Sequence, residues 1–562
     1  MSNTASIVST QHEATSHRHI NPWLLTAFAI ALLVGLPIAS VFWIALFPEE
    51  NIWAHLADTV LPHYVFTTLA LLAGVGGLAI LIGVGTAWLV TMCRFPGRRF
   101  FEWALLLPFA VPAYVIAYVY TDLLEYAGPV QGLLRELFGW STARDYWFPD
   151  IRTLGGAIIM LALVLYPYIY MLARASFLEQ SANIQAASRT LGCTPWQSFY
   201  RVSLPMARPG IAVGLSLVSM ETINDFGTVD FFAVKSLSAG IYDTWLNMGN
   251  LGGAAQIASL MLVFVVMLIT VERIGRAKQR QYHGADRYRE LVSYPLNGAR
   301  KAAAVTACLI PFAAGFLIPV LVLGYYAWDN FAYSWNDQFV TIARNSFLLS
   351  ASAAAVACLI GVLLAYTKRL NQRRSLAIAV NFSGLGYAMP GAVLAIGVLI
   401  PFAAFDNALD SFMRESFGIS TGLLLSGTTF AVLFAYVVRF LAIASGSVES
   451  SLAKVTPTMD MAARSLGLNS LQTLWRVHLP LIRGGLMTGA LVVFVDCMKE
   501  LPATLILRPF NFDTLATHVY QFASDEMIEE AALGSLLIVL VGLLPVILLS
   551  RSIASANGAR KR

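Results

Sequence analysis

About a dozen long apolar segments, separated by short polar stretches, constrain the fold of this chain more than any other feature of its sequence. A membrane-spanning helix needs about 20 consecutive apolar residues. These segments are continuous, whereas the strands of a membrane β-barrel would be short and alternating. Only 12% of the 562 residues are charged, against roughly 25% in soluble proteins. The sequence therefore predicts an all-α polytopic membrane protein and excludes a soluble enzyme. We expect twelve spans, near residues 24–47, 64–92, 101–121, 154–178, 209–226, 252–272, 302–327, 344–367, 376–402, 420–445, 484–501 and 530–550.

A basic stretch in the middle of the chain divides these spans into two groups of six. We expect a first half at residues 1–272, a cytoplasmic linker at 273–301 and a second half at 302–562. If both termini are cytoplasmic, most of the 37 Lys and Arg residues lie on the cytoplasmic side, and the outer loops are acidic instead. Because Lys and Arg concentrate in cytoplasmic loops, this distribution predicts a multi-pass protein with both termini in the cytoplasm.

The two halves are repeats of each other. Residues 186–210 match residues 461–485 with 11 identities in 25 positions, at an offset of 275. Pro112 and Pro390 match at an offset of 278. Both copies of the longer match lie between the fourth and fifth spans of their half, so the halves have the same orientation. The sequence thus predicts two parallel six-helix repeats, and transporters built from repeats place their pathway at the repeat interface.

The loop that carries the longer match has a distinctive pattern of its own. In each copy we expect a short helix that a left-handed glycine ends, then a second short helix with Thr194 or Asn469 as its N-cap. A proline is expected to break this second helix before the next span. An amphipathic helix on the membrane surface is the alternative, but the retention of the pattern twice favours a docking element for a two-fold partner. The residues that we single out are Ala187, Arg189, Gly192, Arg201 and Pro205 in the first copy, and Ala462, Arg464, Gly467, Arg476 and Pro480 in the second.

This loop resembles the EAA signature loop of binding-protein-dependent ABC transporter permeases, in which it docks into the ATPase dimer. The resemblance implies the ABC importer permease fold in the bacterial inner membrane. It also implies a cytoplasmic ABC ATPase dimer and a periplasmic substrate-binding protein as partners, beside membrane lipid and without nucleic acid. One departure is that the leading Glu of the signature is Ala186 in the first copy and Met461 in the second; Gln185 and Asp460 stand one place earlier.

Ionisable residues also lie inside the fifth span of each half. Two carboxylates there are four residues apart, which places them on one side of a helix. Helix breakers follow, so the second carboxylate is expected near a helix C-terminus, where the helix dipole disfavours it. Charges at membrane depth are costly and indicate a transport pathway or a cation site. The alternative is local pairing, of Lys499 with either carboxylate of its half and of Asn224 with its neighbour. The candidate pathway residues are Glu221 and Asp225 in the first half, and Asp496, Lys499 and Glu500 in the second.

The stretches METINDFGTVDFF and KELPATLILRPFNFDTLATHVYQ, which hold all of these residues except Asp496, resemble the fused permeases of ferric-iron ABC importers. The resemblance implies import of ferric iron. Import of thiamine or a phosphonate by the same architecture remains an alternative, and a secondary transporter driven by an ion gradient is a more remote one. The outer segments 122–153 and 403–419 contain short amphipathic pieces. These are either a docking platform for the binding protein or interfacial helices.

Other kinds of site are not indicated by the sequence. The five cysteines form no CxxC pair, and we assign no metal site. None of the seven lysines follows a glycine, so the GxxxxGK[ST] phosphate loop is missing. We expect that the chain is not an enzyme and binds no cofactor, and that ATP is used by its partner subunit.

Overall fold

The computed structural model describes residues 22–178, 190–279, 294–371 and 373–559, with Gln180 and Ser188 in addition. Its helices fall into two similar sets, and a two-residue parallel ladder joins β1 (Cys93–Arg94) to β2 (Tyr294–Pro295). The first set is α1 (Pro22–Leu46), α2 (Trp53–Asp58), α3 (Leu61–Met92), α4 (Arg98–Ala104), η1 (Leu107–Ala110), α5 (Ala113–Leu124), α6 (Pro129–Phe138), α7 (Leu154–Leu178), α9 (Pro195–Ser198), η2 (Phe199–Ser203), α10 (Leu204–Asn224), α11 (Gly227–Phe231), α12 (Leu237–Tyr242), η3 (Asp243–Asn247) and α13 (Leu251–Gln279). The second is α14 (Ala299–Phe312), η4 (Ala313–Leu317), α15 (Ile318–Asp329), α16 (Phe331–Ser334), α17 (Asp337–Leu370), α18 (Arg374–Ser383), η5 (Gly384–Ala388), α19 (Gly391–Phe417), α20 (Thr429–Leu452), α21 (Pro457–Ser465), α22 (Ser470–Thr473), η6 (Leu474–His478), α23 (Leu479–Met498), α24 (Pro502–Leu507), α25 (Leu515–Ser524) and α26 (Ile528–Ala559).

The prediction of about twelve membrane spans is confirmed. Among the described residues, eleven helices are long and apolar enough to cross a membrane, or up to twelve if the bent pair Arg98–Ala110 and Ala113–Phe138 is one span. The bend of 92° in that pair lies at Pro112, which has an extended backbone and is the N-cap of α5. Pro390 has the same place and conformation before α19. Proline has no N–H to continue a helix, so these matched prolines interrupt the predicted spans 101–121 and 376–402.

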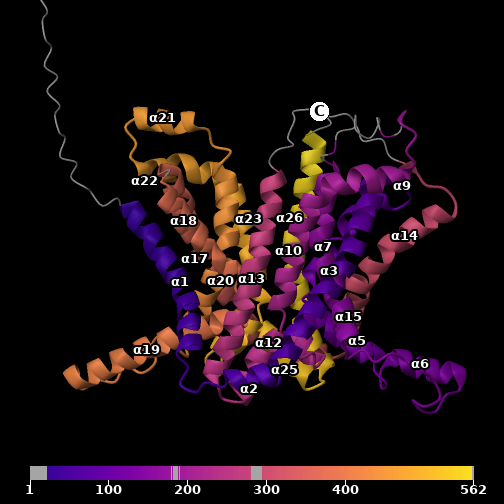
Figure 1. Ribbon diagram of the computed structural model, residues 1–562, viewed down its shortest axis with the longest axis horizontal. Helices are drawn as coiled ribbons and strands as arrows, with labels where there is room; N and C mark the ends of the chain where they lie inside the picture. The colour runs from indigo at the N-terminus through magenta and orange to yellow at the C-terminus, as the bar shows by residue number, and fades with distance from the viewer. Residues whose placement is uncertain are drawn as a thin grey trace, which may run out of the picture.

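The first helix of each half packs against the other half. In Figure 1, α1 lies beside α17 and α18, while α14 and α15 lie on the opposite side, beside α3 and α5. A Cβ on Gly397 of α19 would collide with the backbone of Pro37 in α1, so glycine permits a close approach of these helices. Each of the two large apolar cores therefore contains side chains from both halves. Residues 280–293 of the predicted linker lie outside the described residues.

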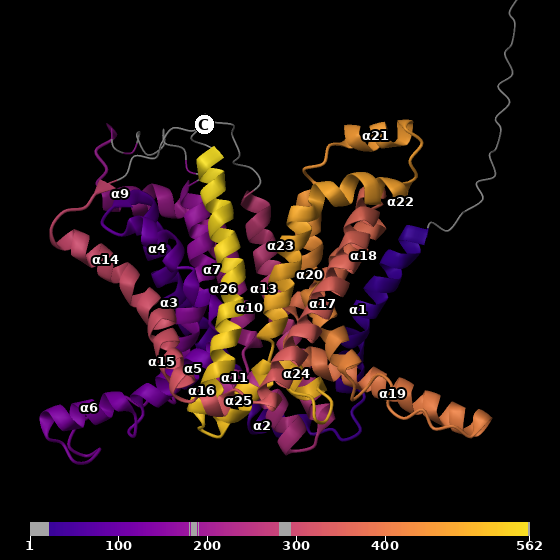
Figure 2. The same cartoon turned by 180° about the vertical axis from the view of Figure 1, so that it is seen from behind.

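The two ends of the bundle carry different elements. Figure 1 shows α9, α21 and the C-terminal end of α26 at one end, and α2, α12 and α25 at the other. At the second end, α6 and the last turns of α19 extend sideways from the bundle in opposite directions (Figure 2). We call α6 with residues 139–150 the first arm, and residues 403–424 the second arm. In the first arm, backbone N–H groups of Thr142 and Ser141 donate to Asp145 and lower the pKa of its carboxyl.

The expectation that Pro205 and Pro480 break the helix before the fifth span is wrong. The chain stays helical from Pro195 to Asn224 and from Ser470 to Met498, because a π turn, η2 or η6, lies just before each proline. In this turn the Leu204 N–H donates to the Phe199 carbonyl, five residues back. The register shift leaves the next residue without a required donor, so a proline is tolerated there.

Candidate functional site

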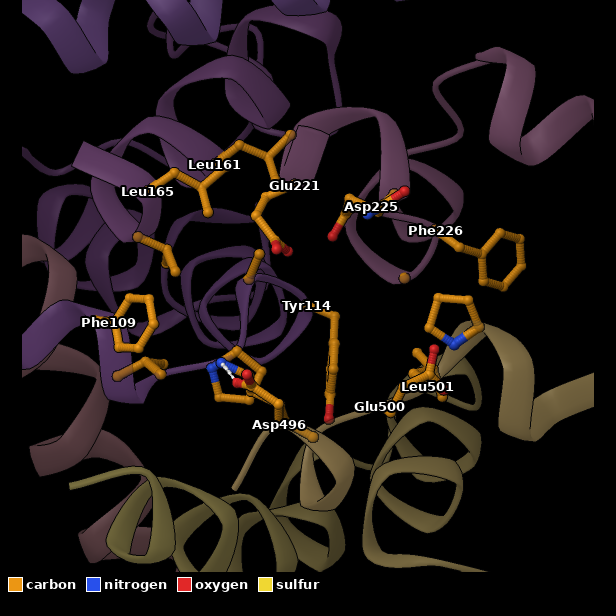
Figure 3. A pocket seen from close by; sticks show the side chains of 18 of the residues that line it. Phe109, Tyr114, Leu161, Leu165, Glu221, Asp225, Phe226, Asp496, Glu500 and Leu501 are labelled. Carbon is orange, nitrogen blue, oxygen red and sulfur yellow. Dashed lines mark ion pairs between the residues drawn. The ribbon is translucent and has the colours of Figure 1, made fainter. Parts of the chain in front are cut away.

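A polar cavity of about 130 Å³ lies where the two halves meet, and all five candidate pathway residues line it. The first half contributes η1, the start of α5, α7 and the end of α10. The second half contributes η5, α20 and the end of α23. Figure 3 shows Glu221 and Asp225 entering from one side and Asp496 and Glu500 from the other. Repeat-related positions thus face each other across one cavity.

The second carboxylate of each half ends one helix and begins the next. Asp225 accepts hydrogen bonds from the backbone N–H groups of Thr228 and Val229, at 3.1 and 3.2 Å, and from the Thr228 hydroxyl at 2.9 Å. Glu500 likewise accepts from the N–H groups of Ala503 and Thr504, which lie in α24. We predicted only an unfavourable helix C-terminus for these groups. They also cap the N-termini of α11 and α24, where unpaired N–H groups favour negative charge.

Both carboxylates of the second half have a cation as partner. Lys499 Nζ lies 2.9 Å from Asp496 Oδ1, and it also stands 4.7 Å from the centre of the Phe109 ring of the first half. Arg439 Nη1 donates to Glu500 Oε1 at 3.1 Å. The side chains of Arg439 and Glu500 are 9% and 2% exposed, so this pair is closed off from water, whereas Asp496 and Lys499 are 14% and 26% exposed.

The two cavity carboxylates of the first half, Glu221 and Asp225, have no cation within salt-bridge distance among the described residues. Glu221 Oε1 accepts a hydrogen bond of 3.2 Å from the Tyr387 hydroxyl, which comes from the second half. The expected bond between Asn224 and Asp225 is not formed, and the Asn224 carbonyl oxygen has no hydrogen-bond partner in the described part of the chain. The Tyr114 side chain also comes from the first half and crosses the cavity toward Glu500, and its hydroxyl is buried without a hydrogen-bond partner in that part of the chain.

Sequence reasoning missed Arg439, Tyr387 and Tyr114. Arg439 is the single charge in the apolar run AVLFAYVVRFLAIAS, and a lone arginine at membrane depth is a functional signal by itself. Its space depends on Gly391, because a Cβ there would lie 2.6 Å from Arg439 Nη1 and 2.7 Å from Glu500 Oε1. The two tyrosines carried no signal, since aromatic residues are frequent in every span.

The cavity is not built as a closed metal cage. Among the described residues, no group of three or more His, Cys, Asp and Glu side chains lies close enough together to hold a metal ion. The carboxylates of the cavity stand on separate walls, an arrangement that suits passage better than storage.

The duplicated loops have matching backbones. Gly192 and Gly467 both have φ +79°, and the residue after each glycine donates its N–H to a carbonyl five residues back, on Ser188 and Ala463. The N-caps Thr194 and Asn469 each form a reciprocal capping box with a glutamine. These local predictions are confirmed by the geometry. Ala187 and Arg189 lie outside the described residues.

Large apolar side chains stand exposed at equivalent positions of the two loops. They are Leu191, Trp196 and Tyr200 in the first, and Leu466, Leu471 and Trp475 in the second, all between 53% and 83% exposed. Arg201, Arg464 and Arg476 are exposed beside them, as are Ala462 and Pro480, while Pro205 is half-buried. Two matched apolar patches at one end of the bundle are a surface of the kind that suits a partner with two-fold symmetry.

The second loop is also tied to α17 by polar contacts. Arg369 donates to Asp460 Oδ2 at 2.8 Å and to the carbonyls of Leu452 and Val455. The buried His478 has its Nε2 2.8 Å from Asp460 Oδ1. The residue that stands one place before the family's leading Glu is thus engaged inside the subunit.

Comparison with known proteins gives the chain a family. The family described as "Binding-protein-dependent transport system inner membrane component" matches residues 79–279 and 357–562, one copy in each half. The Fe(3+)-transport system permease protein FbpB 2 of Haemophilus influenzae is 24% identical over 540 residues, which cover 94% of this chain and 98% of that protein. The ferric transport system permease protein FbpB of Actinobacillus pleuropneumoniae is 22% identical, over 88% of this chain and 72% of its own length.

Permeases of other systems match one half at a time. The molybdenum transport system permease protein ModB of Escherichia coli is 28% identical over 218 residues, which are 36% of this chain and 92% of that protein. A single-half relative therefore aligns with part of a chain that contains two such halves.

Proposed function

Because this chain belongs to the family of binding-protein-dependent transport system inner membrane components, a multi-pass inner-membrane family, we propose that it is the permease subunit of an ABC importer for ferric iron. One chain supplies both halves of the pathway. A periplasmic binding protein delivers the iron, and a separate ATPase dimer hydrolyses ATP. The observation that carries the proposal is the duplicated, solvent-exposed loop at one end of a bundle whose halves enclose a polar cavity.

The ATPase contact is supported by the two loops. Their apolar side chains are presented in pairs, and each loop leads without a break into the helix whose far end lines the cavity, α10 or α23. A movement of the loop is therefore transmitted along one rigid element to the cavity wall. This end of the bundle, with both termini, is cytoplasmic in our proposal.

The nature of the cargo is supported by the cavity charge and by the relatives. Four carboxylates and two cationic side chains line the cavity, which leaves two negative charges without a partner. An oxyanion or a phosphonate would meet this excess at low dielectric, whereas a cation is attracted by it. Ferric iron is a hard cation that prefers oxygen ligands, and the relatives that cover nearly the whole chain are named as ferric permeases.

For the two arms, we favour the membrane–water interface over a docking platform. Leu133, Leu137 and Phe138 of the first arm are exposed, as are Phe412 and Phe417 of the second. Both arms leave the bundle at the same level (Figure 2). Amphipathic helices with aromatic side chains take such positions in the interface.

Transport by the complete system tests the proposal. Vesicles that hold the chain with its ATPase should take up ferric iron only when ATP and the iron-loaded binding protein are both supplied. Uptake that follows an ion gradient in the absence of ATP would contradict the proposal in favour of a secondary transporter. Uptake of thiamine in place of iron would keep the architecture and change the cargo.

A further inference from the structure

The charge balance of the cavity differs between its two walls, and this difference has a consequence for the cargo. Resting on the proposed function, we infer that a passing ferric ion is contacted by the first-half wall, through Glu221 and Asp225 with the neutral oxygens of Asn224 and Tyr114. The repeat-related carboxylates Asp496 and Glu500 are not contacts, although they line the same cavity.

The two cavity carboxylates of the second half are paired with cations of the same half, so we do not count them among the contacts of a passing ion. Glu500 is held by Arg439 and by backbone N–H groups of α24, and its side chain is only 2% exposed. Asp496 is held by Lys499 at 2.9 Å. A cation that bound either group would have to displace an ammonium or guanidinium, at a cost that a transient contact does not repay.

The first half lacks cationic side chains at the equivalent positions. At the positions related to Arg439 and Lys499 by the offset of 275, it has Val164 and Asn224. Glu221 and Asp225 therefore have no salt bridge of their own among the described residues, because the two cations of the cavity, Arg439 and Lys499, are paired with Glu500 and Asp496. An uncompensated carboxylate in such a place is costly, and a cation from the cavity compensates it.

Two oxygens of first-half residues at the cavity lack hydrogen-bond partners among the described residues. The Asn224 carbonyl oxygen and the Tyr114 hydroxyl have no hydrogen-bond partner among the described residues, and the two residues are only 7% and 5% exposed. Figure 3 shows the Tyr114 side chain reaching into the cavity between the acidic groups. Carboxylate, amide and phenol oxygens are all donors that suit a hard cation.

These four side chains do not form a complete metal site, and a transport pathway needs a site that the ion can leave. Asp225 already accepts three hydrogen bonds from Thr228 and Val229, so Glu221 is the least committed carboxylate of the wall. A contact that attracts the ion and still lets it leave must be weak.

A matched set of variants tests the inference in the reconstituted complex. Iron uptake is measured per complex, with co-purification of the ATPase as the measure of assembly. Glu221→Gln should lower uptake at least 10-fold. Glu221→Asp, which keeps the charge, should retain more uptake than the amide. The equivalent change on the other wall is Asp496→Asn combined with Lys499→Met, which removes a neutral pair. This double variant should lose less uptake than Glu221→Gln.

The outcomes distinguish failure of the one-sided contact from failure of the proposed function. Equal losses in Glu221→Gln and in the Asp496–Lys499 double variant would overturn the one-sided contact and leave the iron permease intact. So would normal uptake by an assembled Glu221→Gln complex. If Glu221→Gln does not assemble, a larger loss of uptake in the assembled double variant than in Glu221→Asp would also overturn it. A wild-type complex that carries no iron would overturn the proposed function itself.

Discussion

The two walls of the central cavity come from one repeated sequence, yet they differ in charge. Glu221 and Asp496 occupy equivalent positions. On the second wall, however, a lysine and an arginine stand where the first has Asn224 and Val164. Each carboxylate of the second wall is thereby paired. These two differences between the repeats make the first wall acidic and leave the carboxylates of the second wall balanced by cations.

The duplicated loops show the opposite relation. Their backbones agree in the glycine conformation and in the capping boxes, and their exposed apolar side chains are matched. The loop end of the bundle is thus closely similar in the two halves, whereas the charges of the cavity differ between them.

The largest effect is expected from breaking the buried pair of the second wall. Arg439→Met leaves Glu500 almost fully buried without its cation, which costs about 3 to 5 kcal/mol, and should sharply reduce the amount of folded protein in membranes. Addition of Glu500→Gln should restore much of it. Val164→Met, at the equivalent position of the first wall, is the control. Folded Arg439→Met at wild-type level would show that the second wall does not depend on charge pairing.

A smaller effect, of the same size in both copies, is expected in the two duplicated loops. Gly192→Val and Gly467→Val place a side chain at φ +79°, at about 1 to 2 kcal/mol of strain, and should weaken ATPase association about 10-fold. Gly484→Val is the control, because its Cβ, like those of the two loop glycines, would meet no atom within 4 Å, and its φ is not positive. Titration of the ATPase onto each variant measures the effect; unequal losses would end the symmetry of the docking end.

The polar tie of the second loop should contribute less. Asp460→Asn removes the charge that Arg369 and His478 face, with an expected loss of about 1 kcal/mol in thermal stability. Glu449→Gln is the matched control, since Glu449 and Lys368 are 37% and 36% exposed and such surface pairs contribute little. An equal loss of thermal stability in the control and in Asp460→Asn would show that the Asp460 contacts contribute no more than a surface pair.

The smallest functional effect is expected in the arms, where the halves again resemble each other. Nitroxide labels at Leu137 and Phe412 should be reached by oxygen dissolved in lipid more than by a water-soluble relaxing agent. Labels at Glu136 and Glu415 should show the reverse, and uptake should stay within 2-fold. Protection of Leu137 only when the binding protein is added would identify a docking platform instead.

Much of this arrangement could be predicted from sequence, since local rules determine it. Apolar length defines the spans, and Gly192 with Thr194 defines a helix stop and start. The pairing of Arg439 with Glu500 joins two helices 61 residues apart, and no local pattern specifies such a contact. The exchange of α1 and α14 between the halves is likewise a matter of packing.

The prolines of the loops show a different limit. Pro205 follows the usual rule for a helix breaker, but a π turn of five residues accommodates it. The register of that turn is fixed by the continuation of the helix into the bundle, which lies outside the local pattern.

In our proposal, the transport pathway runs through the cavity between the halves. The chain has five free cysteines; after their replacement, a single Val164→Cys provides one thiol on the first wall. Modification by a bulky hydrophilic thiol reagent during turnover should abolish ATP-driven iron uptake, and saturating iron-loaded binding protein should change the rate of labelling. Stoichiometric labelling of that thiol with full uptake would contradict a pathway through this cavity.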